Sequence, residues 1–228
     1  MLQAIVFDFD GVIVDSEPLH HRAFVEVAGP LGLDLDYPTY LREYIGYDDR
    51  DAFRAMLQQL GREPDDQTIA QLGHEKAAAF ERLASEAVRS IPGAIELIRA
   101  ATDAKLPIAI ASGATRADID LMLDALGLTH HFEVIVSADD VARSKPDPAS
   151  YALAAERLAA YHPDANLQPG ACLAIEDTAA GIASARGAGL MTLGLTTTGP
   201  AEALADAGRV IDSLAGVTIE QLRAWYDD

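Results

Sequence analysis

Residues 4–15 have the sequence AIVFDFDGVIVD, and this stretch decides the fold prediction. Ala4–Phe7 is a short apolar run without polar alternation, which is typical of a strand buried on both faces of a parallel sheet. Asp8 and Asp10 follow it, and alternate side chains of an extended segment point the same way. Gly11 allows the chain to turn immediately afterwards. The stretch therefore predicts a buried strand that ends in two carboxylates, although turn-forming aspartates would give the same pattern.

Four further apolar runs of this kind lie later in the chain, with helical periodicity between them. One helix is expected over Thr115–Leu126, where apolar residues recur at i, i+3, i+4 and i+7. Strands that alternate with helices predict a doubly wound α/β domain. Such a sheet binds ligands at the carboxyl ends of its strands, so polar residues at those ends are the functional candidates. The four runs are Pro107–Ala111, Glu133–Val136, Ala171–Ile175 and Leu190–Leu195.

Residues 16–87 interrupt this alternation, because helical patterns follow one another there without a convincing strand. Glycines, among them Gly46, separate the helical segments and indicate turns. We therefore expect a helical cap domain at 16–87, inserted after the first strand and lying over the carboxyl edge of the sheet. The catalytic core would then be formed by residues 1–15 and 88–228.

The composition excludes several classes of partner. A net charge of −19 argues against nucleic acid, which requires concentrated Lys and Arg, and against an anionic membrane surface. No run reaches the roughly 18 apolar residues of a membrane helix, and no secretory signal is evident, so we expect a soluble, cytoplasmic protein. Cys172 is the only cysteine, which excludes an intrachain disulfide. An anionic substrate would need local positive charge, for which a divalent cation is the natural source.

Polar motifs follow three of the other predicted strands. Ser112 and Gly113 come after the second strand, where a hydroxyl and free backbone N–H groups could bind a phosphate oxyanion. Lys145 precedes a proline, which restricts it to an extended conformation and would fix its ammonium. Glu176 and Asp177 leave the fourth strand, where adjacent buried acids need a cation or hydrogen bonds. Three alternative explanations remain: a helix cap at Ser112 or Thr115, a helix cap at Asp177 or Thr178, and a solvated surface lysine.

The order of these motifs resembles that of the haloacid dehalogenase superfamily, and the resemblance spans nearly the whole chain. It implies a Rossmann-like core with a helical-bundle cap inserted after the first motif. The four similar motifs are Asp8-x-Asp10-Gly-Val-x-x-Asp15, then Ser112, then Lys145, and finally Glu176-Asp177.

The resemblance also implies roles for the residues of the first and fourth motifs. Asp8 would be the nucleophile that forms an aspartyl-phosphate intermediate, and Asp10 would be the general acid and base. Mg²⁺ would be held by Asp8, by the backbone carbonyl of Asp10 and by Asp177. Glu176 would act behind these ligands or through a water.

Within this family, the acid at Asp10 favours phosphate esters, because dehalogenases and phosphonoacetaldehyde hydrolases of similar pattern lack it. We therefore expect a phosphatase of a small phosphorylated metabolite, such as phosphoglycolate or a sugar phosphate. Ser112 and Lys145 would hold the phosphoryl oxygens. One alternative is a β-phosphoglucomutase-like phosphosugar mutase, although the loop 112–116 lacks the Asn of the mutase pattern. The other is a catalytically inactive binding protein.

Candidates for substrate recognition lie mainly in the expected cap. Lys76 interrupts an apolar helical stripe, so it either faces a cleft or extends its ammonium to solvent along that stripe. His20 is either a cleft residue or a structural histidine, and the placements of His20 and Lys76 are similar to those in the mutase. Asp49 and Arg50, after the Gly46 turn, form a further possible specificity loop, and Gly113 completes the candidates. A monomer or weak homodimer is expected.

Overall fold

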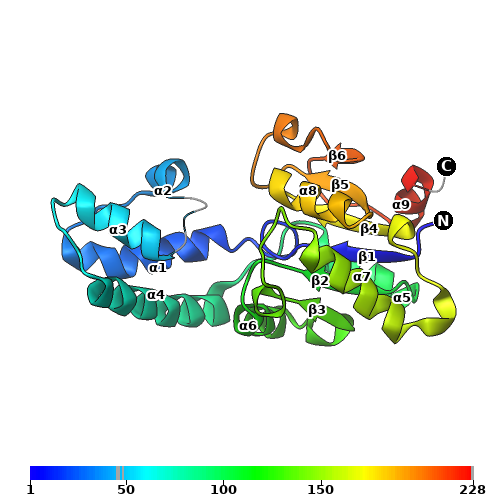
Figure 1. Ribbon diagram of the computed structural model, residues 1–228, viewed down its shortest axis with the longest axis horizontal. Helices are drawn as coiled ribbons and strands as arrows, with labels where there is room; N and C mark the ends of the chain where they lie inside the picture. The colour runs from blue at the N-terminus through cyan, green and yellow to red at the C-terminus, as the bar shows by residue number, and fades with distance from the viewer. Residues whose placement is uncertain (45–46, 48, 227–228) are drawn as a thin grey trace. The chain divides into compact units, whose positions relative to one another are not determined.

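The computed structural model describes residues 1–44, 47 and 49–226, and the chain divides into two compact units (Figure 1). The core unit comprises Met1–Asp15 and Arg89–Asp228, and the helical unit comprises Ser16–Val88. The turn expected at Gly46 lies outside the described residues.

The core unit is built on a parallel sheet of six strands in the order β3-β2-β1-β4-β5-β6. The five predicted strands are present, and each end agrees to within one residue. The last strand was not predicted, because three partly exposed residues at the sheet edge give no continuous apolar run. The strands are β1 (Ala4–Phe7), β2 (Ile108–Ala111), β3 (Val134–Val136), β4 (Cys172–Glu176), β5 (Met191–Leu195) and β6 (Arg209–Ile211).

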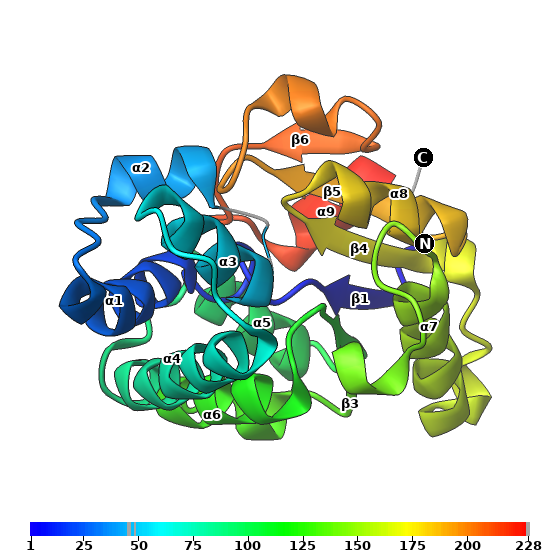
Figure 2. The same cartoon turned by 60° about the vertical axis from the view of Figure 1, so that its left-hand side comes forward.

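Helices cover both faces of this sheet, which confirms the doubly wound α/β prediction (Figure 2). On one face, α7 (Ala149–Tyr161) packs on β1, β2 and β3, and α8 (Ala179–Gly187) packs on β4 and β5. On the other, α5 (Ala94–Asp103) contacts β2 and α9 (Ile219–Tyr226). The helix expected near 115–126 is α6 (Arg116–Leu126), whose first turn is capped by the Thr115 side chain.

The helical unit contains α1 (Glu17–Ala28), α2 (Tyr37–Glu43), α3 (Asp49–Gln59) and α4 (Asp66–Ala87). Helices α1 and α3 both pack against α4 around a buried aromatic cluster, in which the Phe24 and Phe53 rings meet edge to face at 5.1 Å. Asp36 and Asp65 cap α2 and α4 by accepting hydrogen bonds from backbone N–H groups. None of the helices in the described ranges is both long enough and apolar enough to span a membrane.

Candidate active site

The strand order reverses between β1 and β4, since β2 and β3 lie beyond β1 while β5 and β6 lie beyond β4. Ligands of doubly wound sheets bind at such a reversal, outside the carboxyl ends of the strands. Phe7 pairs with Ile175 in the register of the two strands, and the Asp8 N–H donates to the Ile175 carbonyl at 2.9 Å. Asp8 and Glu176 therefore leave adjacent strand ends, as a common site requires.

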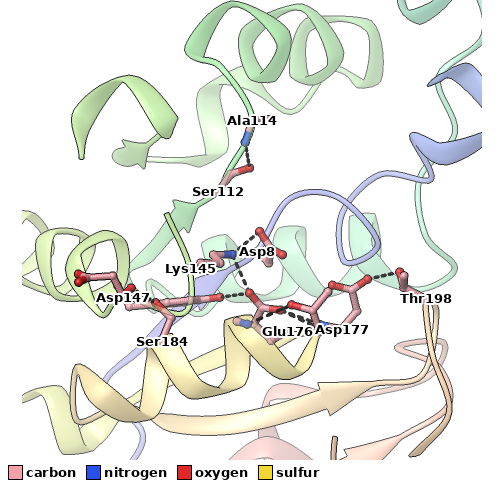
Figure 3. Close-up of polar contacts among 12 residues, drawn as sticks. Asp8, Ser112, Ala114, Lys145, Asp147, Glu176, Asp177, Ser184 and Thr198 are labelled. Atoms are coloured by element: carbon pink, nitrogen blue, oxygen red, sulfur yellow. Dashed lines mark hydrogen bonds and ion pairs between the residues drawn. The ribbon is translucent and has the colours of Figure 1, made fainter. Parts of the chain in front are cut away.

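Lys145 joins these two strand ends through its ammonium (Figure 3). Its Nζ lies 2.8 Å from Asp8 Oδ1 and 2.6 Å from Glu176 Oε1, and only 12% of its side chain is exposed. The loop that carries Lys145 is tied to α8, because the Ser184 hydroxyl donates to the Asp147 carbonyl at 2.6 Å. Burial alone would lower the pKa of Lys145, but the two carboxylates outweigh burial and raise this pKa above its usual range. The ammonium therefore stays protonated.

Glu176 is fully buried, and both of its carboxylate oxygens accept hydrogen bonds. Oε1 accepts from Lys145 and from the Tyr151 hydroxyl at 3.0 Å. Oε2 accepts from the backbone N–H groups of Asp177 and Thr178 and from the Thr178 hydroxyl, at 3.0–3.1 Å. Burial would raise the pKa of Glu176, yet Lys145 and these hydrogen bonds bring it below its usual value. This arrangement orients Lys145 and fits a supporting position behind metal ligands.

Helix α8 approaches Glu176 so closely that its first turn has no room for a side chain. A Cβ at Gly181 would lie 1.7 Å from Glu176 Oε1. The Gly181 N–H donates to the Thr178 hydroxyl at 3.1 Å, so Thr178 caps α8 and contacts Glu176 at the same time. The helix cap expected from the sequence at Asp177 or Thr178 is therefore made by Thr178.

Asp177 provides the observation that tests the site for a metal. It is 4% exposed, and its Oδ2 accepts a hydrogen bond from the Thr198 hydroxyl. Its Oδ1 is buried and has no hydrogen-bond partner within the described part of the chain. Ligand atoms of Asp8, Glu176 and Asp177 all lie within 4.8 Å of one another. A buried, unpartnered carboxylate oxygen is costly unless a cation receives it, and hard oxygen donors suit Mg²⁺, so these residues fit a divalent cation.

Burial and neighbouring negative charge raise the pKa values of two acids at this site. Burial and the neighbouring Glu176 carboxylate outweigh Lys145 and raise the pKa of Asp8 well above its usual value. Burial, with a further contribution from Glu176, raises the pKa of Asp177 to about 7, although the hydrogen bond from Thr198 opposes the change. A cation bound by both carboxylates would oppose both shifts, because it favours their ionised forms.

The remaining predicted core residues lie on neighbouring segments. Ser112 follows β2, which pairs with β1, and it is 1% exposed with its Oγ accepting from the Ala114 N–H at 2.9 Å. Gly113 is exposed beside it. Asp10 is partly buried in the turn after β1, where Gly11 has a φ of +73°. Of the two residues considered as helix caps here, Ser112 and Thr115, the structure shows Thr115 capping α6.

In the helical unit, Lys76 and His20 contact each other. Lys76 is 3% exposed, and its Nζ lies 2.9 Å from His20 Nδ1 and 2.8 Å from Asp49 Oδ1. The ammonium is thus buried within the unit, so it does not extend to solvent along the apolar stripe. The His20 ring stacks on Phe80 at 4.2 Å. Burial, together with the Lys76 charge, lowers the pKa of His20 to about 3, so its ring is neutral and Nδ1 can accept a hydrogen bond.

Arg50 is separate from this pair. Its side chain is 62% exposed, and its guanidinium lies 4.0 Å from the Asp66 carboxylate. The sequence prediction named Asp49 and Arg50 together as a possible specificity loop, and of the two it is Asp49 that contacts Lys76.

Sequence reasoning missed two residues of the core site. Tyr151 lies within α7, and nothing in the helical pattern indicates that its hydroxyl contacts the end of β4. Thr198 belongs to the segment TTTGP at 196–200, directly after the predicted strand Leu190–Leu195. The rule that polar residues after apolar runs are candidates applies to this segment as well, and it would have found Thr198.

Comparisons with known proteins agree with this geometry. A family model described as haloacid dehalogenase-like hydrolase matches residues 2–189. The protein CbbY of Rhodobacter capsulatus is 39% identical over 198 residues, which cover 83% of each chain. Validoxylamine A 7'-phosphate phosphatase of Streptomyces hygroscopicus subsp. limoneus is 30% identical over 218 residues, 95% of this chain and 96% of that protein.

A solved structure is similar along nearly the whole chain. It is a mutant of CbbY from Rhodobacter sphaeroides in complex with xylulose-(1,5)bisphosphate, with 30% sequence identity and a TM-score of 0.78. The similarity covers 95% of this chain and 96% of that one. These matches confirm the resemblance inferred from the four motifs. The chain therefore belongs to the haloacid dehalogenase-like hydrolases.

Proposed function

We propose that this hydrolase is a Mg²⁺-dependent phosphatase of small phosphorylated sugars, with Asp8 as its nucleophile. The observation that carries the proposal is the Lys145 ammonium, held by Glu176 and placed 2.8 Å from Asp8 Oδ1. A carboxylate and a phosphate dianion repel each other, so attack requires fixed positive charge at the point of approach. Lys145 supplies such charge. The buried Oδ1 of Asp177, which has no hydrogen-bond partner in the described part of the chain, could bind a cation that adds further positive charge.

The residues would divide the reaction between them. Bound Mg²⁺, held by Asp8, the Asp10 carbonyl and Asp177, would neutralise and orient the phosphoryl group. Lys145 and the Ser112 hydroxyl would hold phosphoryl oxygens while Asp8 attacks phosphorus and the bond to the sugar oxygen breaks. Asp10 would protonate the departing alkoxide and then take a proton from the water that cleaves the aspartyl phosphate. Phosphate leaves and the Asp8 carboxylate is restored.

The substrate class rests on the relatives. One is named as the phosphatase of validoxylamine A 7'-phosphate, and the similar CbbY structure holds xylulose-(1,5)bisphosphate. Both names describe phosphate esters of sugar-like polyols. Sugar monophosphates and bisphosphates are therefore our first candidates, and phosphoglycolate serves as the smaller comparison substrate.

The first experiment tests the reaction itself with a generic aryl phosphate and Mg²⁺. We expect hydrolysis that EDTA abolishes and Mg²⁺ restores. Asp8→Asn should reduce kcat at least about 10³-fold, because residues that act directly in covalent catalysis cost this much when removed. Asp120→Asn is the matched control, since Asp120 pairs with Arg116 on the surface of α6. Acid-quenched protein should carry one phosphoryl group on the peptide that contains Asp8, and Asp10→Asn should increase its amount.

Equal activity of the Asp8→Asn and Asp120→Asn variants would exclude Asp8 as the nucleophile. A wild-type protein that binds sugar phosphates and Mg²⁺ but hydrolyses none would instead favour a binding protein.

We propose further that the helical unit acts as a cap that contributes to the choice of substrate. Lys76 and His20 are the candidates, because a buried ammonium contacts both a neutral imidazole and the Asp49 carboxylate while it lies over the rings of Phe24 and Phe80. Lys76→Met should change the ratio of kcat/KM between sugar phosphates and aryl phosphate by at least about tenfold, or about 1.4 kcal/mol. Arg50→Gln tests the exposed candidate in the same way. Equal ratios in Lys76→Met and wild type would remove Lys76 from substrate selection.

The contact between Lys76 and His20 also keeps a phosphosugar mutase as the second candidate, because the placements of these two residues are similar to those in β-phosphoglucomutase. A panel of hexose phosphates, pentulose bisphosphates, phosphoglycolate and β-glucose 1-phosphate with bisphosphate activator separates the two activities. Phosphate release without isomerisation is the expected result. Isomerisation much faster than release would establish the mutase.

A further inference from the structure

Three successive threonines follow β5, and their hydroxyls contact three different parts of the core unit. Thr196 Oγ1 donates to the exposed Asp212 carboxylate at 3.0 Å. Thr197 Oγ1 donates at 2.5 Å to the carbonyl of Gly11, in the turn after β1. Thr198 Oγ1 donates to Oδ2 of Asp177, at the end of β4. The second and third hydroxyls thus connect the turn after β1 with the acidic end of β4.

The Asp177 carboxylate is held between the Thr198 hydroxyl and the backbone of Gly11. A Cβ at Gly11 would lie 1.9 Å from Asp177 Oδ2 and 2.8 Å from Thr198 Oγ1, so the carboxylate packs directly on the Gly11 backbone. Figure 3 shows Thr198 on the side of Asp177 that faces away from Lys145. Oδ2 is therefore held by the Thr198 hydroxyl, whereas Oδ1 is buried and lacks a hydrogen-bond partner among the described residues.

We propose that Thr198 is a positioning residue that selects Oδ1 of Asp177 as the metal-binding oxygen. The proposal rests on the proposed function, since the cation is the Mg²⁺ invoked there. The two oxygens of a carboxylate are equivalent until a neighbour distinguishes them, and a hydrogen bond to one fixes the orientation of the other. Thr198 does this without adding positive charge beside the cation, as a lysine or arginine would. Thr197 attaches the threonine segment 196–198 to the turn after β1 by donating to the Gly11 carbonyl.

The test is the Mg²⁺ affinity of four proteins, measured by isothermal titration calorimetry. Thr198→Val removes the hydroxyl at nearly constant shape and should weaken Mg²⁺ binding about 10–100-fold, the usual effect of losing a partner that orients a metal ligand. Thr198→Ser keeps the hydroxyl, so its Mg²⁺ affinity should stay within about threefold of the wild-type affinity, a much smaller change than that of Thr198→Val. Thr196→Val is the matched control, because its hydroxyl contacts only exposed Asp212 among the hydrogen bonds described.

A kinetic readout separates positioning from a direct catalytic role. In Thr198→Val, the Mg²⁺ concentration needed for half-maximal hydrolysis of aryl phosphate should rise with the calorimetric constant, while kcat at saturating Mg²⁺ returns to within a few-fold of wild type. Thr198 is an exposed residue, so the variant should fold, and its circular dichroism melting curve verifies this.

Wild-type affinity in Thr198→Val would overturn the proposal. So would equal losses in Thr198→Val and Thr198→Ser, or in Thr198→Val and Thr196→Val, because the hydroxyl of Thr198 would then not be the cause. If wild type itself neither binds Mg²⁺ nor requires it for hydrolysis, the metal in the proposed function fails and this inference fails with it. That result can be told apart from a failure of the role proposed for Thr198, because it is seen in the wild-type protein alone.

Discussion

The neutral, partly buried His20 should make the helical unit less stable in mild acid. Burial and the adjacent Lys76 lower the pKa of His20 from 6.5 to about 3. When the pH falls from 8 to 5, the unfolded chain gains a proton on this imidazole and the folded protein does not. The unfolded state is then favoured, so this contribution to stability is present above pH 6.5 and is lost as the pH falls below it.

The size of the effect follows from the interval between pH 6.5 and pH 5. Each pH unit below the pKa of the unfolded chain costs about 1.36 kcal/mol, so His20 should cost the folded protein about 2 kcal/mol at pH 5. His20→Asn removes the titrating group and keeps an acceptor near the position of Nδ1. This variant should therefore lose about 2 kcal/mol less than wild type between pH 8 and pH 5. Comparing variants at equal pH cancels the titration of the other acids and bases.

The assay is urea unfolding at pH 8 and pH 5, followed by circular dichroism at 222 nm. Trp225 is the single tryptophan and lies on α9, so its fluorescence follows the core unit separately. His74→Asn is the matched control, because His74 is exposed on α4 and meets water in both states. Equal losses of stability in wild type and His20→Asn would refute the reasoning, since His20 would then take up its proton in the folded protein.

Three further predictions concern packing and the acidic site. Gly73→Ala in α4 should stabilise the protein by about 0.5–1 kcal/mol, whereas Gly181→Ala in α8 should destabilise it by about 1–3 kcal/mol. The reason is that a Cβ at Gly73 would meet no described atom within 4 Å beyond its chain neighbours and the backbone of its own helix, whereas a Cβ at Gly181 would collide with Glu176. Thermal and urea unfolding of the two variants check this. Tyr151→Phe should cost about 1.5–3 kcal/mol in urea unfolding, because Glu176 loses a buried hydrogen bond to its charged form; an unchanged midpoint would contradict it. Finally, the pKa of Asp177 is raised from 3.8 to about 7, so the folded protein without metal holds this proton more tightly than the unfolded chain does. The contribution of Asp177 to stability is therefore lost as the pH rises from 3.8 to about 7. Calorimetry should accordingly show Mg²⁺ affinity rising from pH 5.5 to 8 with release of protons, and an affinity independent of pH would show that Asp177 is already ionised.

Much of the fold could be predicted because it depends on local patterns. Strands buried on both faces are apolar at most positions, and β1 to β5 were found for that reason. Strand β6 and the short helix α2 lack such a pattern, since edge and surface elements do not need one. A doubly wound sheet was expected, and the reversal of strand order seen in this sheet explains why residues as distant in sequence as Asp8 and Asp177 share one site.

The site could be predicted only to the extent that its residues lie at the ends of strands or in the loops that follow them. Asp8, Lys145 and Glu176 meet as expected. The partners that determine their charge could not be found in this way, because they depend on packing between elements. The Tyr151 hydroxyl contacts Glu176 from a helix, and the contact between Asp49 and Lys76 joins two helices. Residue type at a given position indicates a possible charge, whereas only tertiary structure shows which neighbour compensates it.

The discontinuous core unit has a consequence for synthesis on the ribosome. Strand β1 is translated before both of its partners, since β2 begins at Ile108 and β4 begins at Cys172. The helical unit is complete in sequence before either partner emerges, and a domain generally folds as a unit during translation. The nascent chain therefore carries a folded bundle of helices next to an apolar strand with two open edges. A translation product that stops before Cys172 leaves one of those edges free to pair with another chain.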